Sequence, residues 1–341
     1  MKDQKEKEKR VEEFLRKTRE RVDPALEELL LRHGGERFEE PFLYFIRTGG
    51  KRLRPALVFL GTEALGGNEE DAIYPAVAVE ILHNYSLLVD DIIDRSETRR
   101  GNPTVWKKWG RAATECIGMH YAASVFRGAL YCPSPSRVSS ILSDALQVLV
   151  EGEMMDVLQE RKGREEEEFF RRWKYKEVDI EDAFSMMEKK TAKLLEASCE
   201  IGAVCAGASE ERVEEMKSYG FHLGMAFQMR DDILDIFGEE KKFGKKIGKD
   251  IEERKGGNVV ILFALEEREK LREFLEEKED LIDEDLREAT RIISETNAKE
   301  RAMELCEEHA EKAKEKLERF SQTPERDIMV NMVDELLKRE K

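Results

Sequence analysis

The sequence contains two copies of the acidic pattern Asp-Asp-x-x-Asp, about 140 positions apart, each within an apolar stretch. The copies comprise Asp90, Asp91 and Asp94, and Asp231, Asp232 and Asp235. At about 3.6 residues per helical turn, the first and last acid of each copy project from one helix face. One such copy could be a helix cap or a solvated charge cluster, but two in matched apolar settings need a cation to offset burial. The pair therefore predicts a site for Mg²⁺ and a polyphosphate, because Mg²⁺ combines a few carboxylates with water and phosphate oxygens.

The remaining sequence indicates helix almost throughout. Its 341 residues include only eight prolines, and neither strand-like alternation nor a linker rich in Pro, Gly or Ser stands out. We therefore expect an all-α protein with one domain over residues 1–341. Within it we expect an N-terminal helix over 1–35, broken near Pro24, and a catalytic core over 36–325.

Amphipathic and apolar patterns predict further helices, and Gly101 and Pro103 predict a loop between two of them. The predicted helices span 55–66, 71–94, 109–131, 138–160, 180–206 and 210–236. The glycine-punctuated basic segment 238–258 is interpreted as a loop over the site.

Charge and cysteine content narrow the classes of function. The net charge of −16 argues against general nucleic-acid binding, which needs a basic face. Five cysteines without a Cys-x-x-Cys pair indicate reduced thiols and a cytoplasmic protein. The charged N-terminus lacks the apolar core of a signal peptide. We expect no transmembrane segment, since no apolar run approaches the roughly 20 residues that a bilayer requires.

Five motifs in a fixed order carry a resemblance to a known family. They are GGKRLRP at 49–55, EILHNYSLLVDDIIDRSETRRG at 80–101, EKKTA at 188–192, FQMRDDILD at 227–235 and GKKIGKD at 244–250. From about residue 40 to 320 the chain resembles the trans-isoprenyl diphosphate synthases of the polyprenyl synthetase family. In pattern it is most similar to short-chain archaeal-type geranylgeranyl and farnesyl diphosphate synthases.

The resemblance implies a helical bundle of the isoprenoid synthase type with a central substrate cavity. It implies condensation of isopentenyl diphosphate with dimethylallyl, geranyl or farnesyl diphosphate by ionisation, condensation and elimination. It also implies three Mg²⁺ ions per active site and a homodimer.

The family's site residues transfer to matching positions here. Asp90 and Asp94 would hold two Mg²⁺ ions and Asp231 a third, with Asp91, Asp232 and Asp235 as weaker or water-mediated ligands. The allylic diphosphate would meet Arg99, Lys190, Lys246 (or its neighbour Lys245) and Lys255, and the carbocation would face Thr191 and Gln228. Isopentenyl diphosphate would bind Gly50, Lys51, Arg54, His83 and Arg100. Without the motifs, a single lysine would be interpreted as a surface residue, and His83, Thr191 and Gln228 as core polar residues.

Two residues before the first motif bear on product length. Tyr85 lies five positions before Asp90, and the small Ser86 lies four before it. This combination, without an insertion in the motif, resembles archaeal-type geranylgeranyl diphosphate synthases and predicts a C20 product. Farnesyl diphosphate (C15) is the alternative, and ordinary helix packing is the alternative role for Tyr85.

Four positions depart from the family pattern. They are Met119 where relatives often have Asp, Glu153 where they often have Gln, Arg230 where an uncharged residue is common, and Arg254 where Gly usually precedes the lysine. These departures are consistent with a divergent member of the family that has a modified substrate or chain-length specificity. The other readings are a class I terpene cyclase, disfavoured by GGKRLRP, and a non-catalytic synthase subunit, disfavoured because all six motif carboxylates are present.

Overall fold

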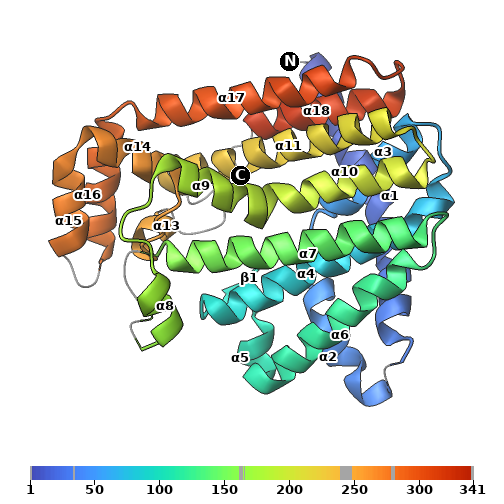
Figure 1. Cartoon of the computed structure of the whole chain (residues 1–341), viewed down its shortest axis with the longest axis horizontal. Coiled ribbons are helices and arrows are strands. Elements are labelled where there is room, and N and C mark those ends of the chain that lie inside the picture. The colour runs from blue at the N-terminus through green and yellow to red at the C-terminus, as the bar shows by residue number, and fades with distance from the viewer. Residues whose placement is uncertain are drawn as a thin grey trace. The chain divides into compact units, whose positions relative to one another are not determined.

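The computed structural model describes residues 2–33, 35–160, 164, 166–238, 248–277 and 281–338. Over these residues the protein is helical apart from one small antiparallel hairpin, which confirms the all-α prediction (Figure 1).

The elements follow one another along the chain in this order. The first part contains α1 (Lys2–Leu31), η1 (Glu36–Phe38), α2 (Glu39–Arg47), α3 (Leu53–Ala64), η2 (Glu69–Ala72), α4 (Ile73–Ile93), β1 (Thr98–Arg99), β2 (Asn102–Pro103), α5 (Val105–Trp109), α6 (Arg111–Ala129) and α7 (Pro135–Leu158). The second part contains α8 (Glu168–Trp173), α9 (Ile180–Met187), the π-helical turn η3 (Glu188–Ala192), α10 (Lys193–Cys205), α11 (Glu210–Phe237), α13 (Lys249–Glu252), α14 (Val259–Glu267), α15 (Glu269–Glu277), α16 (Asp283–Ser294), α17 (Ala298–Leu317) and α18 (Pro324–Lys338).

The chain divides into two compact units by the contacts within each. Unit 1 comprises residues 1–147, 194–220 and 316–332, and unit 2 comprises residues 148–193, 221–315 and 333–341. The first acidic motif lies in unit 1 and the second in unit 2. The single domain over residues 1–341 stays a prediction.

Helix α4 is the central helix of unit 1. It packs against α1, α3 and α6 (Figure 1), and its Ala76, Val77 and Leu82 are fully buried. A helix that is apolar on every side is typical of a protein core. The first acidic motif therefore lies at the C-terminal end of a well-packed helix.

Among the described residues, one segment is long and apolar enough to span a bilayer by length and composition. It covers Glu69–Ile93, and 61% of its most apolar window is buried inside the protein. The expectation that no apolar run approaches this length is therefore wrong. A buried core helix meets the same criterion, so the length of this segment is weak evidence for a membrane span.

The predicted break near Pro24 is wrong, because α1 continues through this residue. Proline removes one backbone hydrogen bond from a helix interior. The apolar side chains of Val22, Leu26 and Leu30 are fully buried around it, and this packing offsets the lost bond.

The loop predicted around Gly101 and Pro103 contains a hairpin. Thr98 pairs with Pro103, and Arg99 pairs with Asn102. The two residues between them, Arg100 and Gly101, have φ angles of 53° and 74°. Two positive φ angles in a two-residue turn match the twist of paired strands. The hairpin thus fixes the backbone from which Arg99 projects.

Candidate functional site

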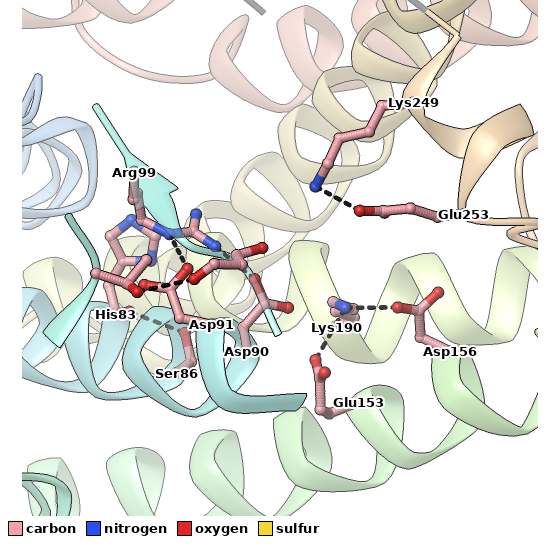
Figure 2. A network of polar contacts seen from close by, with 12 residues as sticks. His83, Ser86, Asp90, Asp91, Arg99, Glu153, Asp156, Lys190, Lys249 and Glu253 are labelled. Carbon is pink, nitrogen blue, oxygen red and sulfur yellow. Dashed lines mark hydrogen bonds and ion pairs between the residues drawn. The ribbon is translucent and has the colours of Figure 1, made fainter. Parts of the chain in front are cut away.

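The first acidic motif in unit 1 is held by Arg99 from the hairpin (Figure 2). Its guanidinium donates from Nη2 to Asp90 Oδ2 at 2.8 Å and from Nε to Asp91 Oδ1 at 2.7 Å. Asp94 caps the end of α4, and its backbone N–H donates to Asp90 O at 2.8 Å. The three acids therefore occupy the last turn of one helix, as their spacing predicts.

Asp91 is the buried member of this motif, with 1% of its surface exposed. Burial raises its pKa to about 6, and the charges of Asp90 and Asp94 add to this effect, whereas Arg99 opposes it. Its Oδ2 accepts no hydrogen bond from the described part of the chain. A carboxylate in this position is stabilised by added positive charge.

A cluster of cations lies beside the first motif in unit 1. Arg54 Nη1 lies 3.1 Å from His83 Nε2, and Arg100 donates from Nη1 to Gly49 O. The pKa of His83 lies well below its ordinary value because the ring is removed from solvent and faces several guanidinium groups, Arg54 first among them. Neutral imidazole and cationic guanidinium groups together supply donors for an anion.

Gly50 lies against this cluster with a φ of 142°, a conformation that favours glycine. A Cβ atom there would stand 2.9 Å from Arg52 Nη1 and 3.3 Å from Arg100 Nη1. The structure thus brings together four of the predicted isopentenyl diphosphate residues, and the fifth, Lys51, is an exposed neighbour of Gly50 in the chain.

Arg52 has a structural role that the motif alone did not indicate. Its side chain is buried, and it donates to Asp23 Oδ1 at 2.7 Å and to Glu80 Oε1 at 3.0 Å. It also donates to the backbone oxygens of Ile46 and Gly49. Arg52 therefore ties the Gly-Gly segment to α1 and α4.

Replacing Arg52 with methionine is expected to lower the free energy of unfolding by about 3 kcal/mol or more, because buried Glu80 loses its countercharge. Urea denaturation of both proteins measures the difference. The matched control is Arg37→Met, which removes the same cation from an exposed position in η1 and should leave stability nearly unchanged. Equal losses in the two variants would contradict the role of Arg52.

Tyr85 packs against α6 within unit 1. A Cβ atom on Gly118 would lie 3.1 Å from Tyr85 Cε2 and 3.6 Å from Leu88 Cδ2. The ring therefore fills the space that the missing side chain of Gly118 leaves. Met119 is 66% exposed, so this departure from the family pattern lies on the outer face of α6. Ser86 is half-buried and donates to His83 O at 2.8 Å.

The second motif in unit 2 is connected to EKKTA through a chain of hydrogen bonds. Thr191 Oγ1 donates to Gln228 Oε1 at 2.7 Å, and Gln228 Nε2 donates to Asp232 Oδ1 at 2.8 Å. Asp232 is buried, and its Oδ2 accepts the backbone N–H of Val259 at 3.0 Å. Asp232 thereby also supports the N-terminus of α14, where a negative charge is favourable.

Asp235 meets another acid, Asp250 of α13. Asp235 Oδ2 accepts the Asp250 backbone N–H at 3.1 Å, and the Asp250 carboxylate accepts from Asn258 Nδ2 at 2.8 Å. Burial, and then the charge of Asp250, raise the pKa of Asp235 to about 8. Asp231, the first acid of the motif, is half-buried. A group of buried acids with raised pKa values is typical of a site that binds a cation.

Two predicted diphosphate-binding lysines meet at one carboxylate of α7. Figure 2 shows the first of them, Lys190, between Asp156 and Glu153. Asp156 Oδ2 lies 2.7 Å from Lys190 Nζ and 2.9 Å from Lys255 Nζ. Glu153, one turn earlier, lies 2.9 Å from Lys190 Nζ through Oε2, and Glu160 lies 3.5 Å from Lys255 Nζ. The carboxylate of Asp156 offsets the repulsion between the two ammonium groups. Glu153 thus takes part in this network.

A π-helical turn places Lys190 and Thr191 beside α7. The helix predicted over 180–206 is interrupted at Glu188–Ala192, and such π-turns occur frequently at functional sites. A Cβ atom on Gly152 would lie 2.4 Å from the backbone N of Lys190. Only glycine allows α7 and the π-turn to approach this closely.

Asp156→Asn is expected to lower the free energy of unfolding by about 3 kcal/mol at pH 7, because two cations lose a buried partner. Lys190 and Lys255 depress the pKa of Asp156 against the effect of burial. The stabilisation is therefore complete above the unfolded-state pKa of about 4 and declines as the pH falls below it. Urea denaturation of both proteins from pH 7 to pH 3 should show a shrinking difference. Glu181→Gln, an exposed change on α9, is the control, and a pH-independent difference would contradict the ion pairs.

The remaining predictions have mixed outcomes. Lys245 and Lys246 lie outside the described residues. Arg230 donates to Met303 Sδ at 3.1 Å, which places its guanidinium against α17.

In the described part of the chain, no group of three or more carboxylate, imidazole or thiol side chains is positioned to hold a metal ion.

Sequence reasoning missed Asp156 and Asp250. Asp250 is the last residue of the GKKIGKD motif, in which only lysines are predicted site residues. Asp156 lies three residues after Glu153, so the i, i+3 spacing of acids on an apolar helix was a usable signal.

The comparison with known proteins assigns the family. Residues 35–293 match the family model described as polyprenyl synthetase. The chain belongs to the polyprenyl synthetase family.

Two curated relatives align with most of the sequence of this polyprenyl synthetase. Geranylgeranyl diphosphate synthase of Methanosarcina mazei is 34% identical over 323 residues, which is 94% of this chain and 95% of that protein. The (2E,6E)-farnesyl diphosphate synthase of Mycobacterium tuberculosis is 36% identical over 243 residues, 71% of this chain and 64% of that protein.

Solved structures confirm the fold of this polyprenyl synthetase. Geranylgeranyl pyrophosphate synthetase from Pyrococcus horikoshii has a TM-score of 0.81 at 30% identity, covering 98% of this chain and 99% of that one. Polyprenyl synthase from Caulobacter crescentus, solved with calcium and isoprenyl diphosphate, has a TM-score of 0.84 at 26% identity and covers 96% and 98%.

Proposed function

We propose that this polyprenyl synthetase condenses isopentenyl diphosphate with allylic diphosphates and releases geranylgeranyl diphosphate. The observation that carries the product length is the Tyr85 ring, packed against Gly118 of α6. Tyr85 lies about 7.5 Å before Asp90 along the axis of α4. A rigid aromatic ring at this depth would stop a growing chain near C20. The archaeal relative named a geranylgeranyl diphosphate synthase supports this choice over C15.

The residues of each unit supply the anion-binding part of the reaction. In unit 1, Arg54, Arg100 and neutral His83 would bind isopentenyl diphosphate, which is not ionised. Within unit 1, the planar guanidinium of Arg99 suits a diphosphate through two parallel donors. Within unit 2, the ammonium groups of Lys190 and Lys255 suit a diphosphate as point charges. Thr191 and Gln228 would direct oxygen atoms at the carbocation. Released diphosphate would accept the final proton, so no dedicated base is required.

The donor set of both motifs fits Mg²⁺. Its protein ligands would be carboxylate oxygens, and Mg²⁺ is usually held by one or two carboxylates together with water and substrate phosphates. Asp90 and Asp94 would hold two ions and Asp231 a third, and the raised pKa values of Asp91 and Asp235 indicate carboxylates that a cation would stabilise. When bound, Mg²⁺ stabilises the negative charge on the departing diphosphate. The Caulobacter relative, solved with calcium and a diphosphate, supports this assignment.

We also propose a cytoplasmic homodimer. The outer face of α6 in unit 1 carries exposed Met119 and Phe126, and exposed Leu130 caps its C-terminal end. At helical spacing these side chains form an apolar stripe. A second copy of the chain would cover it. Light scattering should give a dimer, and Met119→Glu with Phe126→Glu should give a monomer. All five cysteines are free thiols, which suits a reducing compartment.

The test of function is incubation with Mg²⁺, isopentenyl diphosphate and each radiolabelled allylic diphosphate, followed by phosphatase treatment and chromatography. We expect a linear C20 alcohol from all primers and no turnover in the presence of a chelator. A C15 end product would replace the C20 assignment by farnesyl diphosphate synthase. A cyclic hydrocarbon would indicate a terpene cyclase, and no turnover would indicate a non-catalytic subunit.

A further inference from the structure

Two histidines of unit 2 face each other outside the predicted diphosphate-binding residues. His222 lies on α11 and His309 lies on α17, and their Nδ1 atoms are 3.1 Å apart. The ring centroids are 5.1 Å apart with an interplanar angle of 56°. Both side chains are half-buried, so the pair is sheltered but within reach of solvent.

The contact is a hydrogen bond between like atoms. It forms only when one ring donates its N–H and the other offers a lone pair, so at least one imidazole is neutral. A neutral imidazole nitrogen is also the atom that binds a metal ion. The two potential coordinating nitrogens therefore already lie side by side and share one proton.

The separation of the two nitrogens suits a shared metal ion. Two imidazole nitrogens bound to one tetrahedral Zn²⁺ at about 2.0–2.1 Å lie roughly 3.3 Å apart. The observed 3.1 Å is close to this value. Small side-chain rotations would be enough to aim both lone pairs at one ion.

A carboxylate is available as a third ligand. Glu308 precedes His309 on α17; its ion pair with Lys312, and after it the two imidazoles, lower the pKa of its carboxyl. It is exposed and accepts from Lys312 Nζ at 2.5 Å. No three ligand-type side chains of the described residues already converge as a metal site. Glu308 would therefore have to leave Lys312, with water filling the other positions.

We propose that His222 and His309 form a binding site for a divalent transition metal such as Zn²⁺, with Glu308 and water completing its coordination. Imidazole favours Zn²⁺, Cu²⁺ and Ni²⁺, whereas Mg²⁺ prefers oxygen ligands. The site is thus chemically distinct from the acidic motifs. The ion would join α11 to α17 within unit 2. Its ligand His222 lies nine residues before Asp231 on α11.

The test is calorimetric titration of the full chain with ZnCl₂ in excess MgCl₂, which competes for the carboxylate motifs. We expect one zinc ion per chain, and binding at least about tenfold weaker in His222→Gln and in His309→Gln. Glu308→Gln should weaken binding less. His33→Gln, an exposed histidine after α1, is the matched control and should bind like the parent. Circular dichroism confirms that each variant is folded.

A second measurement separates histidine ligands from thiols. The electron paramagnetic resonance spectrum of bound Cu²⁺ should show nitrogen coupling, and this coupling should disappear in the double variant His222→Gln/His309→Gln. Zinc binding that survives both substitutions, that is lost on alkylation of cysteines, or that is absent from the parent protein would overturn the proposal. In those cases the two histidines form a hydrogen bond only.

Discussion

Asp90→Asn is expected to lower kcat for prenyl transfer by about 10³-fold, since ligands of a bound metal contribute several kcal/mol of transition-state stabilisation. Asparagine keeps the size of the side chain but removes the charge that Asp90 offers to Arg99 and to Mg²⁺. Initial rates with saturating farnesyl and isopentenyl diphosphates measure the effect.

The matched control for this substitution is Asp144→Asn. Asp144 is exposed on α7. Its substitution removes the same charge from the protein without changing the acidic motif. The control should retain the parent rate. Equal rates in the two variants would mean that Asp90 takes no part in the reaction, and the proposed function would lose its main residue.

Tyr85→Ala is expected to lengthen the product by one or more five-carbon units. Removing the ring opens the space between α4 and α6 that Tyr85 fills against Gly118. Lost burial of the ring should cost stability as well, in the range of about 3–5 kcal/mol for a fully buried aromatic and less for this half-buried one. Chromatography of the dephosphorylated products measures the length.

Two neighbouring substitutions sharpen this prediction. Ser86→Phe places a second aromatic ring before the motif and should shorten the product to C15, whereas Ser86→Ala keeps a small residue and should leave it at C20. Unchanged product length in both Tyr85→Ala and Ser86→Phe would assign Tyr85 to helix packing alone.

Local spacing predicted most of the helices and the common helical turn of the first acidic motif. Asp90 and Asp94 occupy one helical turn because the i, i+4 relation is a property of the α-helix itself. The family and the all-helical fold were also predicted correctly, because motif order and apolar periodicity are properties of the linear sequence. The prediction of a break at Pro24 was wrong. Proline removes one backbone hydrogen bond, but the packing of Val22 and Leu26 offsets this loss.

The roles of the charged side chains depended on contacts between distant segments. Arg99 reaches Asp90 and Asp91 because a two-residue turn folds the hairpin back towards α4. Lys190 and Lys255 are far apart in sequence, yet both contact Asp156.

The sequence by itself determined that this chain is a helical polyprenyl synthetase and where its acidic motifs lie, because helix periodicity and motif chemistry are local. Only the tertiary structure decided which cations neutralise which acids, that Gly118 makes room for Tyr85, and that His222 meets His309. Such pairings depend on how close two helices approach, and that distance is set by the side chains packed between them.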